Sequence, residues 1–281
     1  MLHNPFIPVV ERSKEQMDIS RPCYRFNSAI VRNPSTSVVC GLRTNDNGDP
    51  VYSRLKPEHD AYVTTLESLG LEVTVLPELK DFPDSVFVED PALVFSEGAI
   101  LLRSGAASRQ GETNEIAPIL QDIFNTVLEL PQPGHADGGD ILVTPKFVLI
   151  GLSKRTDSAG ASGLIECLKI LGYNGKIVNT PEGVLHFKTE CSLLDEETIV
   201  VTRRMAQSGL FEGFRKIQIP DGEEPAANVV RINDAVLVSA GHQRTIEILE
   251  NNGYLTVPVK TTEIEKIDAG LSCMSLRWYR C

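Results

Sequence analysis

The sequence has few of the features that mark membrane, nucleic-acid-binding or secreted proteins. No stretch of it approaches the roughly 20 apolar residues that span a bilayer, and the first twenty residues hold no apolar run long enough for a secretory signal. Lys and Arg number 27 against 38 Asp and Glu, so the formal net charge is −11, and the basic residues do not cluster as phosphate contacts require. We therefore expect a cytoplasmic protein that binds neither membrane nor nucleic acid. Its acidity suits a small cationic ligand.

The cysteines lack the spacing of a disulfide framework or a metal finger. The six residues, Cys23, Cys40, Cys167, Cys191, Cys273 and Cys281, include no C-x-x-C pair. Reduced thiols are therefore expected. His135, Asp137, His186 and Cys273 have ligand types that zinc accepts, but no pair of them has the short spacing of a metal motif, so we expect no metal site.

A pattern of β-hairpin, amphipathic helix, short apolar strand and polar loop occurs five times along the chain, with a period of roughly 40 to 55 residues. If the five units close into a ring, their polar loops converge on its axis. We therefore predict an α/β fold of one domain, a closed ring of five units with pseudo-fivefold symmetry and a site on the axis. An open mixed α+β sheet with similar spacings is the alternative. The strands that end the units run up to Pro77, Pro131, Pro181, Pro220 and Lys260.

Helices and hairpins can be assigned within these units. Glycines at 70, 172 and 253 each follow an apolar helical pattern, where a left-handed residue lets the chain turn back into a strand. Leu164, Leu168 and Leu171 share one helix face and predict its burial. We expect helices over 56–69, 112–125, 157–171 and 243–252, a weaker one over 206–212, and strand pairs over 92–103, 141–152, 191–201 and 229–239.

Three of the polar loops carry a nucleophile, a base and a carboxylate. A thiol needs a nearby base or cation to become a nucleophilic thiolate, and Cys273, His186 and Asp137 occupy matching loop positions. Each residue also has a purely structural alternative. Cys273 could be a buried small apolar residue, His186 a half-buried histidine with its hydrogen bonds satisfied, and Asp137 part of an ordinary Asp-Gly turn. If Cys273 is the nucleophile, we expect it to be alkylated before the other cysteines.

Acidic and basic loop residues suggest the ligand. Asp84 and Asp90 would face one side of an extended segment, with Glu89 on the other, and this charge cluster beside apolar residues suits a planar cation. Arg109 and Arg155 stand in loops, where simple solvent exposure is the alternative. Together they suit a substrate that is cationic at one end and a carboxylate at the other.

At these residues the sequence closely resembles the dimethylarginine dimethylaminohydrolases, guanidine-modifying members of the pentein superfamily. The resemblance runs from about Ser28 to Trp278 and implies a closed five-unit α/β propeller over residues 28–281, preceded by an extension over residues 1–27. It rests on the segments GLRTNDNGDP, FPDSVFVEDPALV, RSGAASRQGETNEI, ADGGD, GLSKRTDSAGA, VLHFKTECSLL, AANVVRIND and KIDAGLSCMSLRW.

The resemblance also implies residue roles. Cys273 would be the nucleophile, His186 the general acid and base, and Asp137 the acidic partner of the histidine. The substrate would be held by the acidic residues Asp84, Glu89 and Asp90, by Arg109 and Arg155 at its carboxylate, by the backbone carbonyl of Ile267 near its α-amino group, and by Leu42 in a mobile lid.

The implied reaction is the hydrolysis of asymmetric dimethylarginine or monomethylarginine to citrulline and dimethylamine or methylamine, through a covalent thiouronium on the cysteine. The resemblance implies no cofactor, and a monomer or homodimer. An arginine deiminase, an amidinotransferase, a citrulline hydrolase and a non-catalytic ribosome-binding pentein remain alternatives.

Overall fold

The computed structural model describes residues 22–44 and 47–281. Most of the predicted extension, residues 1–21, lies outside the described residues. Residues 22–27, the part of the extension that is described, pack on the rest of the protein. The guanidinium of Arg231 lies 4.0 Å from the centre of the Tyr24 aromatic ring, and the Phe26 N–H donates to Asn233 Oδ1 at 3.0 Å. A domain boundary at residue 28 stays a prediction.

The described residues form five three-stranded sheets of one topology. In each sheet the middle strand is antiparallel to its hairpin partner and parallel to the strand that follows a helix. The sheets comprise β15 (Leu276–Trp278), β1 (Ser28–Arg32) and β2 (Glu72–Leu76); β3 (Ala92–Phe95), β4 (Gly98–Leu101) and β5 (Val127–Glu129); β6 (Ile141–Val143), β7 (Val148–Leu152) and β8 (Gly175–Asn179); β9 (Cys191–Leu193), β10 (Thr198–Val201) and β11 (Arg215–Gln218); β12 (Val230–Ile232), β13 (Ala235–Ser239) and β14 (Leu255–Val259).

The last strand of the chain closes the ring. β15 pairs with β1 in antiparallel register, with Ser28 opposite Trp278 and Ile30 opposite Leu276. It thereby takes the place that β3, β6, β9 and β12 take in the other sheets. Residues of these five strands line a central cavity of about 440 Å³. The predicted closed five-unit fold is confirmed, and the open-sheet alternative is wrong.

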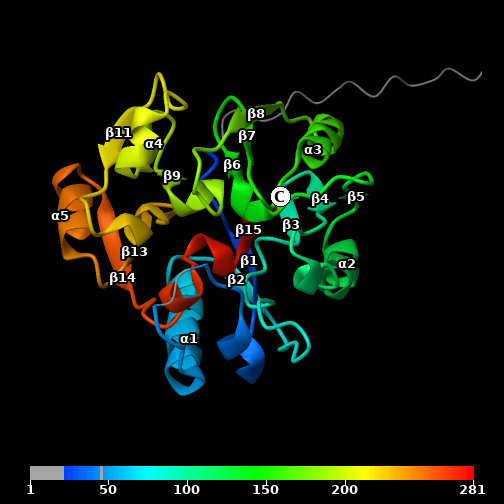
Figure 1. Cartoon of the computed structure of the whole chain (residues 1–281), viewed down its shortest axis with the longest axis horizontal. Coiled ribbons are helices and arrows are strands. Elements are labelled where there is room, and N and C mark those ends of the chain that lie inside the picture. The colour runs from blue at the N-terminus through cyan, green and yellow to red at the C-terminus, as the bar shows by residue number, and fades with distance from the viewer. Residues whose placement is uncertain (1–21, 45–46) are drawn as a thin grey trace, which may run out of the picture.

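One helix covers the outside of each sheet (Figure 1). Four predicted helices are confirmed to within four residues at each end, and glycines 70, 172 and 253 adopt φ values of +89°, +89° and +86° after them. Among the described helices, none combines the length and apolarity needed to cross a bilayer. The helices are α1 (Tyr52–Ser68), α2 (Glu112–Ile123), α3 (Ser158–Ile170), α4 (Arg203–Gln207) and α5 (Gln243–Asn251).

The predicted position of the fourth helix is wrong. Thr202 caps α4 directly after β10, because its hydroxyl accepts a hydrogen bond from the Met205 N–H at 3.3 Å. Gly209 and Gly213 then adopt left-handed conformations, so the helix cannot run to residue 212. The chain reaches β11 through turns instead.

The apolar cores lie between each sheet and its helix. The predicted leucine stripe on α3 is confirmed, since Leu164, Leu168 and Leu171 are buried against β6 and β7 residues. The packing of each helix on its sheet therefore fixes the strands from which the loops at the axis extend.

His59 on α1 is a polar exception within a core. It is 0% exposed, and neither ring nitrogen has a hydrogen-bond partner among the described residues. Burial lowers the pKa of His59 from its ordinary 6.5 to about 4. Between pH 6.5 and about 4, the imidazole is therefore neutral in the folded protein and protonated in the unfolded chain.

We expect His59 to make the fold acid-sensitive. Its contribution to the free energy of unfolding is complete above pH 6.5 and falls by about 3 kcal/mol as the pH drops from 6.5 to 4, because only the unfolded state takes up the proton in that window. Urea unfolding of wild type and His59→Leu from pH 7.5 to 4 measures the difference. The variant should lack this part of the loss, and His135→Gln, at a half-exposed histidine, should keep it. Parallel curves for wild type and His59→Leu would contradict the prediction.

Candidate active site

The predicted site residues lie in short turns at one end of the ring axis. Asp137 and His186 are the residues that precede the 3-10 turns η3 (Gly138–Asp140) and η4 (Phe187–Thr189), and Cys273 lies within η7 (Ser272–Met274). Each turn connects the outer strand of one unit to the hairpin of the next. The repeated topology thus brings residues 136 positions apart in the sequence, Asp137 and Cys273, to the same end of the ring.

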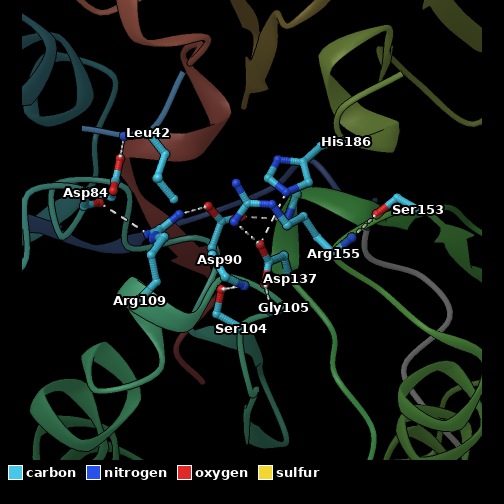
Figure 2. A network of polar contacts seen from close by, with 12 residues as sticks. Leu42, Asp84, Asp90, Ser104, Gly105, Arg109, Asp137, Ser153, Arg155 and His186 are labelled. Atoms are coloured by element: carbon cyan, nitrogen blue, oxygen red, sulfur yellow. Dashed lines mark hydrogen bonds and ion pairs between the residues drawn. The ribbon is translucent and has the colours of Figure 1, made fainter. Parts of the chain in front are cut away.

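His186 is held between buried carboxylates (Figure 2). Its Nε2 lies 3.3 Å from Asp137 Oδ2, and Asp137 itself is fixed by the Gly105 N–H, which donates to Oδ1 at 3.0 Å. The imidazole lies close above Gly139, where a Cβ atom would stand 2.7 Å from His186 Nδ1. A side chain at residue 139 would displace the ring, which explains the glycine.

The Asp140 carboxylate holds the turn that follows His186. Asp140 Oδ1 accepts the Phe187 N–H at 2.9 Å, and its Oδ2 accepts the hydroxyls of Ser153 and Thr156 at 2.6 and 2.7 Å. Burial raises the pKa of Asp140 against the effect of these hydrogen bonds. The position of His186 therefore depends on the neighbouring unit.

The charge of His186 follows from its surroundings. Burial disfavours the imidazolium, but Asp90 above all, then Asp137 and Asp140, outweigh this and raise the pKa of His186 to about 9. The side chain is therefore a cation at neutral pH. It can donate a proton before it can accept one.

Arg109 is buried, not exposed. It lies in a 3-10 turn with 5% of its surface accessible, paired with Asp90 and with Glu112 Oε2 at 2.7 Å. Its Nη2 also donates to the carbonyls of Asp84 and Phe87 at 3.2 and 3.1 Å. The alternative of simple solvent exposure is therefore wrong for Arg109. The carboxylate-holding role predicted for it stays a proposal.

This guanidinium opposes the effect of burial on the pKa of two carboxyls. Asp90 is buried, which favours its neutral form, but Arg109 and then His186 hold the pKa of Asp90 down at about 2. Burial raises the pKa of Glu112 to about 7, despite the same arginine. The sequence interpretation missed Glu112, although its spacing of three from Arg109 on a helix could have indicated the pair.

The acidic segment 82–91 is a series of turns rather than the extended chain predicted. Asp84 Oδ1 accepts the Leu42 N–H at 2.9 Å, on the Arg109 side, whereas Glu89 points away and pairs with Lys188 Nζ at 2.5 Å. The separation of Asp84 and Asp90 from Glu89 is thus confirmed, but turns produce it. Burial raises the pKa of Asp84.

Leu42, Arg155 and Ile267 surround this acidic centre. Leu42 is 39% exposed, and Arg155 Nη1 lies 3.7 Å from Asp137 Oδ2 with its side chain 18% exposed. Ile267 is buried in η6 (Glu265–Ile267), and the next residue, Asp268, is left-handed at φ +52°. The Asp268 carboxylate accepts the Thr44 hydroxyl at 2.7 Å, so the Leu42 loop and the Ile267 turn are joined.

Cys273 is buried beside the acidic segment. It is 8% exposed, and its carbonyl accepts the Glu89 N–H at 3.2 Å. Burial, and then the negative charges of Glu89 and Asp90, raise the pKa of the Cys273 thiol to about 12. Cys40 and Cys281 are the exposed thiols, so the expectation that Cys273 is alkylated first stays a prediction. A cation beside the carboxylates would offset the part of the shift that Glu89 and Asp90 cause.

The structure does not assemble the zinc set considered from the sequence. His135 instead lies 3.2 Å from Asp157 at the surface. Within residues 22–44 and 47–281, the group of metal-ligand side chains that converges is Asp90, Asp137 and His186. Arg109 pairs with the first carboxylate of that group and Arg155 approaches the second, so cations already compensate it.

Comparison with known proteins was made by sequence and by structure. The arginine deiminase family model matches residues 77–224. An N(G),N(G)-dimethylarginine dimethylaminohydrolase of Pseudomonas aeruginosa is 39% identical over 254 residues, 90% of this chain and all of the relative. One of Streptomyces coelicolor is 33% identical over 253 residues, 89% of this chain and 96% of that one. The structure of a cysteine-to-serine mutant of the Pseudomonas enzyme, complexed with citrulline, matches with a TM-score of 0.88 at 38% identity, over 90% of this chain and all of that one.

We expect Asp137→Asn to lower the pKa of His186 from about 9, because the isosteric amide keeps the shape and removes a charge that stabilises the imidazolium. Titration of the imidazole C–H resonances by NMR measures the change. Asp157→Asn, which removes the carboxylate beside His135 instead, should leave the His186 titration unchanged. Equal His186 titrations in wild type and Asp137→Asn would contradict the assigned electrostatics.

Proposed function

Since the chain belongs to the dimethylarginine dimethylaminohydrolase family, we propose that it hydrolyses N-omega-methylated arginine to citrulline and the corresponding methylamine. The observation that carries the proposal is the joining of Cys273, the acidic segment and a protonated His186 in one buried centre. The Glu89 N–H donates to the Cys273 carbonyl, and Asp90, next in sequence, lies beside His186. A thiol, a proton donor and a cation-binding surface are what this reaction needs.

Substrate binding activates the nucleophile. The guanidinium of the substrate lies between Asp84 and Asp90, with Arg155 and Arg109 at its carboxylate and Ile267 near its amine. The new positive charge offsets Glu89 and Asp90, the two charges that raise the pKa of Cys273. The thiol proton is lost to solvent, and a thiolate forms next to the guanidinium carbon.

The first half-reaction releases the amine. The thiolate electron pair forms a bond to the guanidinium carbon and gives a tetrahedral adduct. The His186 imidazolium then donates a proton to the methylated nitrogen, the carbon–nitrogen bond breaks, and dimethylamine or methylamine leaves. A thiouronium on Cys273 and a neutral His186 remain.

The second half-reaction releases citrulline. Neutral His186 takes a proton from water, and the hydroxide adds to the thiouronium carbon. Collapse of this adduct breaks the sulfur–carbon bond and returns the electron pair to Cys273, while the hydroxyl proton of the adduct passes to solvent and the ureido group of citrulline forms. The sum is one substrate and one water to one citrulline and one amine.

Selectivity for methylated substrates comes from apolar surface at the reacting nitrogen. Methylation removes hydrogen-bond donors from that nitrogen, so a pocket made for free arginine would leave acceptors unpaired. Phe87 packs in the same apolar cluster as Cys273, and Leu42 is the exposed apolar residue of the facing loop. These two side chains are assigned to the methyl groups. A cytoplasmic location and a monomeric or homodimeric state stay predictions.

Incubation with asymmetric dimethylarginine, monomethylarginine and arginine side by side tests the function. We expect citrulline with dimethylamine or methylamine, and a kcat/KM for the methylated substrates roughly tenfold or more above that for arginine, since placing a bare NH2 on apolar surface costs about 1–3 kcal/mol. Citrulline and each amine are quantified by mass spectrometry.

Two results would overturn this assignment. Faster hydrolysis of arginine, with ammonia as product, would place the chain among the deiminases. Cys273→Ser should abolish turnover, because a serine hydroxyl is a poor nucleophile without a stronger base, and retained activity within tenfold of wild type would remove Cys273 from the mechanism.

Arg155→Ala tests the carboxylate contact. We expect KM for dimethylarginine to rise at least about tenfold, because charge-assisted hydrogen bonds contribute about 1.5–3 kcal/mol, with a smaller change in kcat. Agmatine, which lacks the carboxylate, should be a poor substrate for wild type. Lys154→Ala removes an adjacent, exposed cation and serves as control. Turnover of agmatine as fast as of dimethylarginine would give the arginines another role.

A further inference from the structure

The side chain of Asn228 connects the nucleophile turn to the histidine turn. Its Oδ1 accepts the Ser272 N–H at 2.8 Å, and its Nδ2 donates to the Lys188 carbonyl and to Ser272 Oγ, each at 3.0 Å. Ser272 directly precedes Cys273, and Lys188 follows His186 by two residues. One buried amide thus holds both turns.

The orientation of this amide is fixed by chemistry. Both contacts of its nitrogen are with oxygens and its oxygen accepts an N–H, so exchanging the two ends would face the carbonyl of Asn228 towards the carbonyl of Lys188. The side chain is 5% exposed. A buried amide with these partners satisfied is rigid, because breaking any of its contacts leaves a polar group without water.

Packing leaves no room for another arrangement. A Cβ atom on Gly270 would lie 2.5 Å from Asn228 Cγ, so the backbone of the nucleophile loop runs directly against the amide. Asn228 itself ends the turn η5 (Glu224–Ala227), which the Ser192 hydroxyl ties to its own sheet through the Ala227 carbonyl at 2.8 Å. The sheet of β9, β10 and β11 therefore supports both the histidine turn η4 and the nucleophile turn η7 through Asn228.

We propose that Asn228 is a positioning residue that sets the placement of Cys273 relative to His186. The inference rests on the proposed function, since it assigns a role within that reaction. Attack requires the sulfur at the guanidinium carbon, and protonation requires the imidazole at the leaving nitrogen bound to that carbon. A misplacement of about 1 Å can cost a hundredfold in rate. The Asn228 amide contacts neither Asp84, Arg155, Leu42 nor Ile267, and it reaches Glu89 only through the Ser272 hydroxyl, which donates to Glu89 Oε2 at 3.0 Å. Substrate affinity should therefore depend on it much less than the rate does.

The first measurement separates kcat from KM. For Asn228→Ala with asymmetric dimethylarginine, kcat should fall between about tenfold and a hundredfold, while KM stays within about twofold of wild type. Ser192→Ala is the matched control: it removes one buried hydrogen bond of the same length from the same turn without touching Ser272 or Lys188, and it should retain kcat.

The second measurement is the pH profile of kcat/KM for Asn228→Asp. This variant keeps an acceptor for the Ser272 N–H, loses both donated hydrogen bonds, and adds a negative charge near the thiol. The rising limb of the profile should move to higher pH, because another carboxylate makes the Cys273 proton harder to remove. A shifted limb with wild-type kcat would mean that only the added charge acts on the thiol, and it would overturn the positioning role.

The outcomes distinguish the two proposals. Wild type that hydrolyses no methylated arginine overturns the proposed function. Active wild type overturns the positioning role alone if Asn228→Ala keeps wild-type kcat, if its KM rises as much as its kcat falls, or if Ser192→Ala loses as much kcat. Where Asn228→Ala does not fold, Asn228→Asp decides: a wild-type kcat and pH profile overturn the inference, and lower kcat with the shifted limb supports it.

Discussion

The ion pair between Arg109 and Asp90 is the interaction on which the site depends. Both groups are almost completely buried, and an uncompensated charge at such a place costs several kcal/mol. Arg109 also binds the carbonyls of Asp84 and Phe87, so the same cation that neutralises Asp90 folds the acidic segment into its turns. Asp90 in turn accepts the Gly139 N–H at 3.0 Å and stabilises the charge of His186. Loss of this pair would therefore disturb the substrate surface and the histidine together.

The resting charges of the centre are the reverse of a preformed thiolate and neutral base. The thiol is neutral with a pKa near 12, and the imidazole is charged with a pKa near 9. The negative charge of Asp90 contributes to both shifts: it is the largest cause that raises the pKa of His186, and it adds to burial and Glu89 in raising the pKa of Cys273. A guanidinium placed on that carboxylate lowers the thiol pKa and leaves the imidazolium poised to give up its proton. Under the proposed function, the positive charge of the substrate would offset the carboxylates that raise the pKa of the thiol.

Much of the fold and of the site could be predicted from the sequence. Hydrophobic periodicity indicates the helices and strands, and the polar loops between them carry the candidate site residues. The four hairpins, four helices and the meeting of Cys273, His186 and Asp137 at one end of the ring depend only on chain order and strand direction. The burial of Arg109 did not follow, since the loop SGAASRQGE gives no sign that two acids and two carbonyls enclose it. The contacts of Ser272 and Asn228 were missed because they join different units, and no local pattern records a contact over 44 residues, such as that of Asn228 with Ser272. Glu112 was missed although its partner Arg109 lies only three residues away.

The ring also explains why the nucleophile stands so near the end of the chain. Cys273 lies only three positions before the start of β15, and β15 is the strand that pairs with β1 to close the first sheet. Its position is therefore tied to the longest-range strand pairing among the described residues, which has a larger loop-closure entropy than the hairpins within the chain. The backbone contact of Glu89 with Cys273 and the amide contact of Asn228 with Ser272 complete that closure at the axis. A chain that has not closed its ring consequently presents neither the buried thiol nor the charges that control it, so the chemistry is confined to the fully folded state.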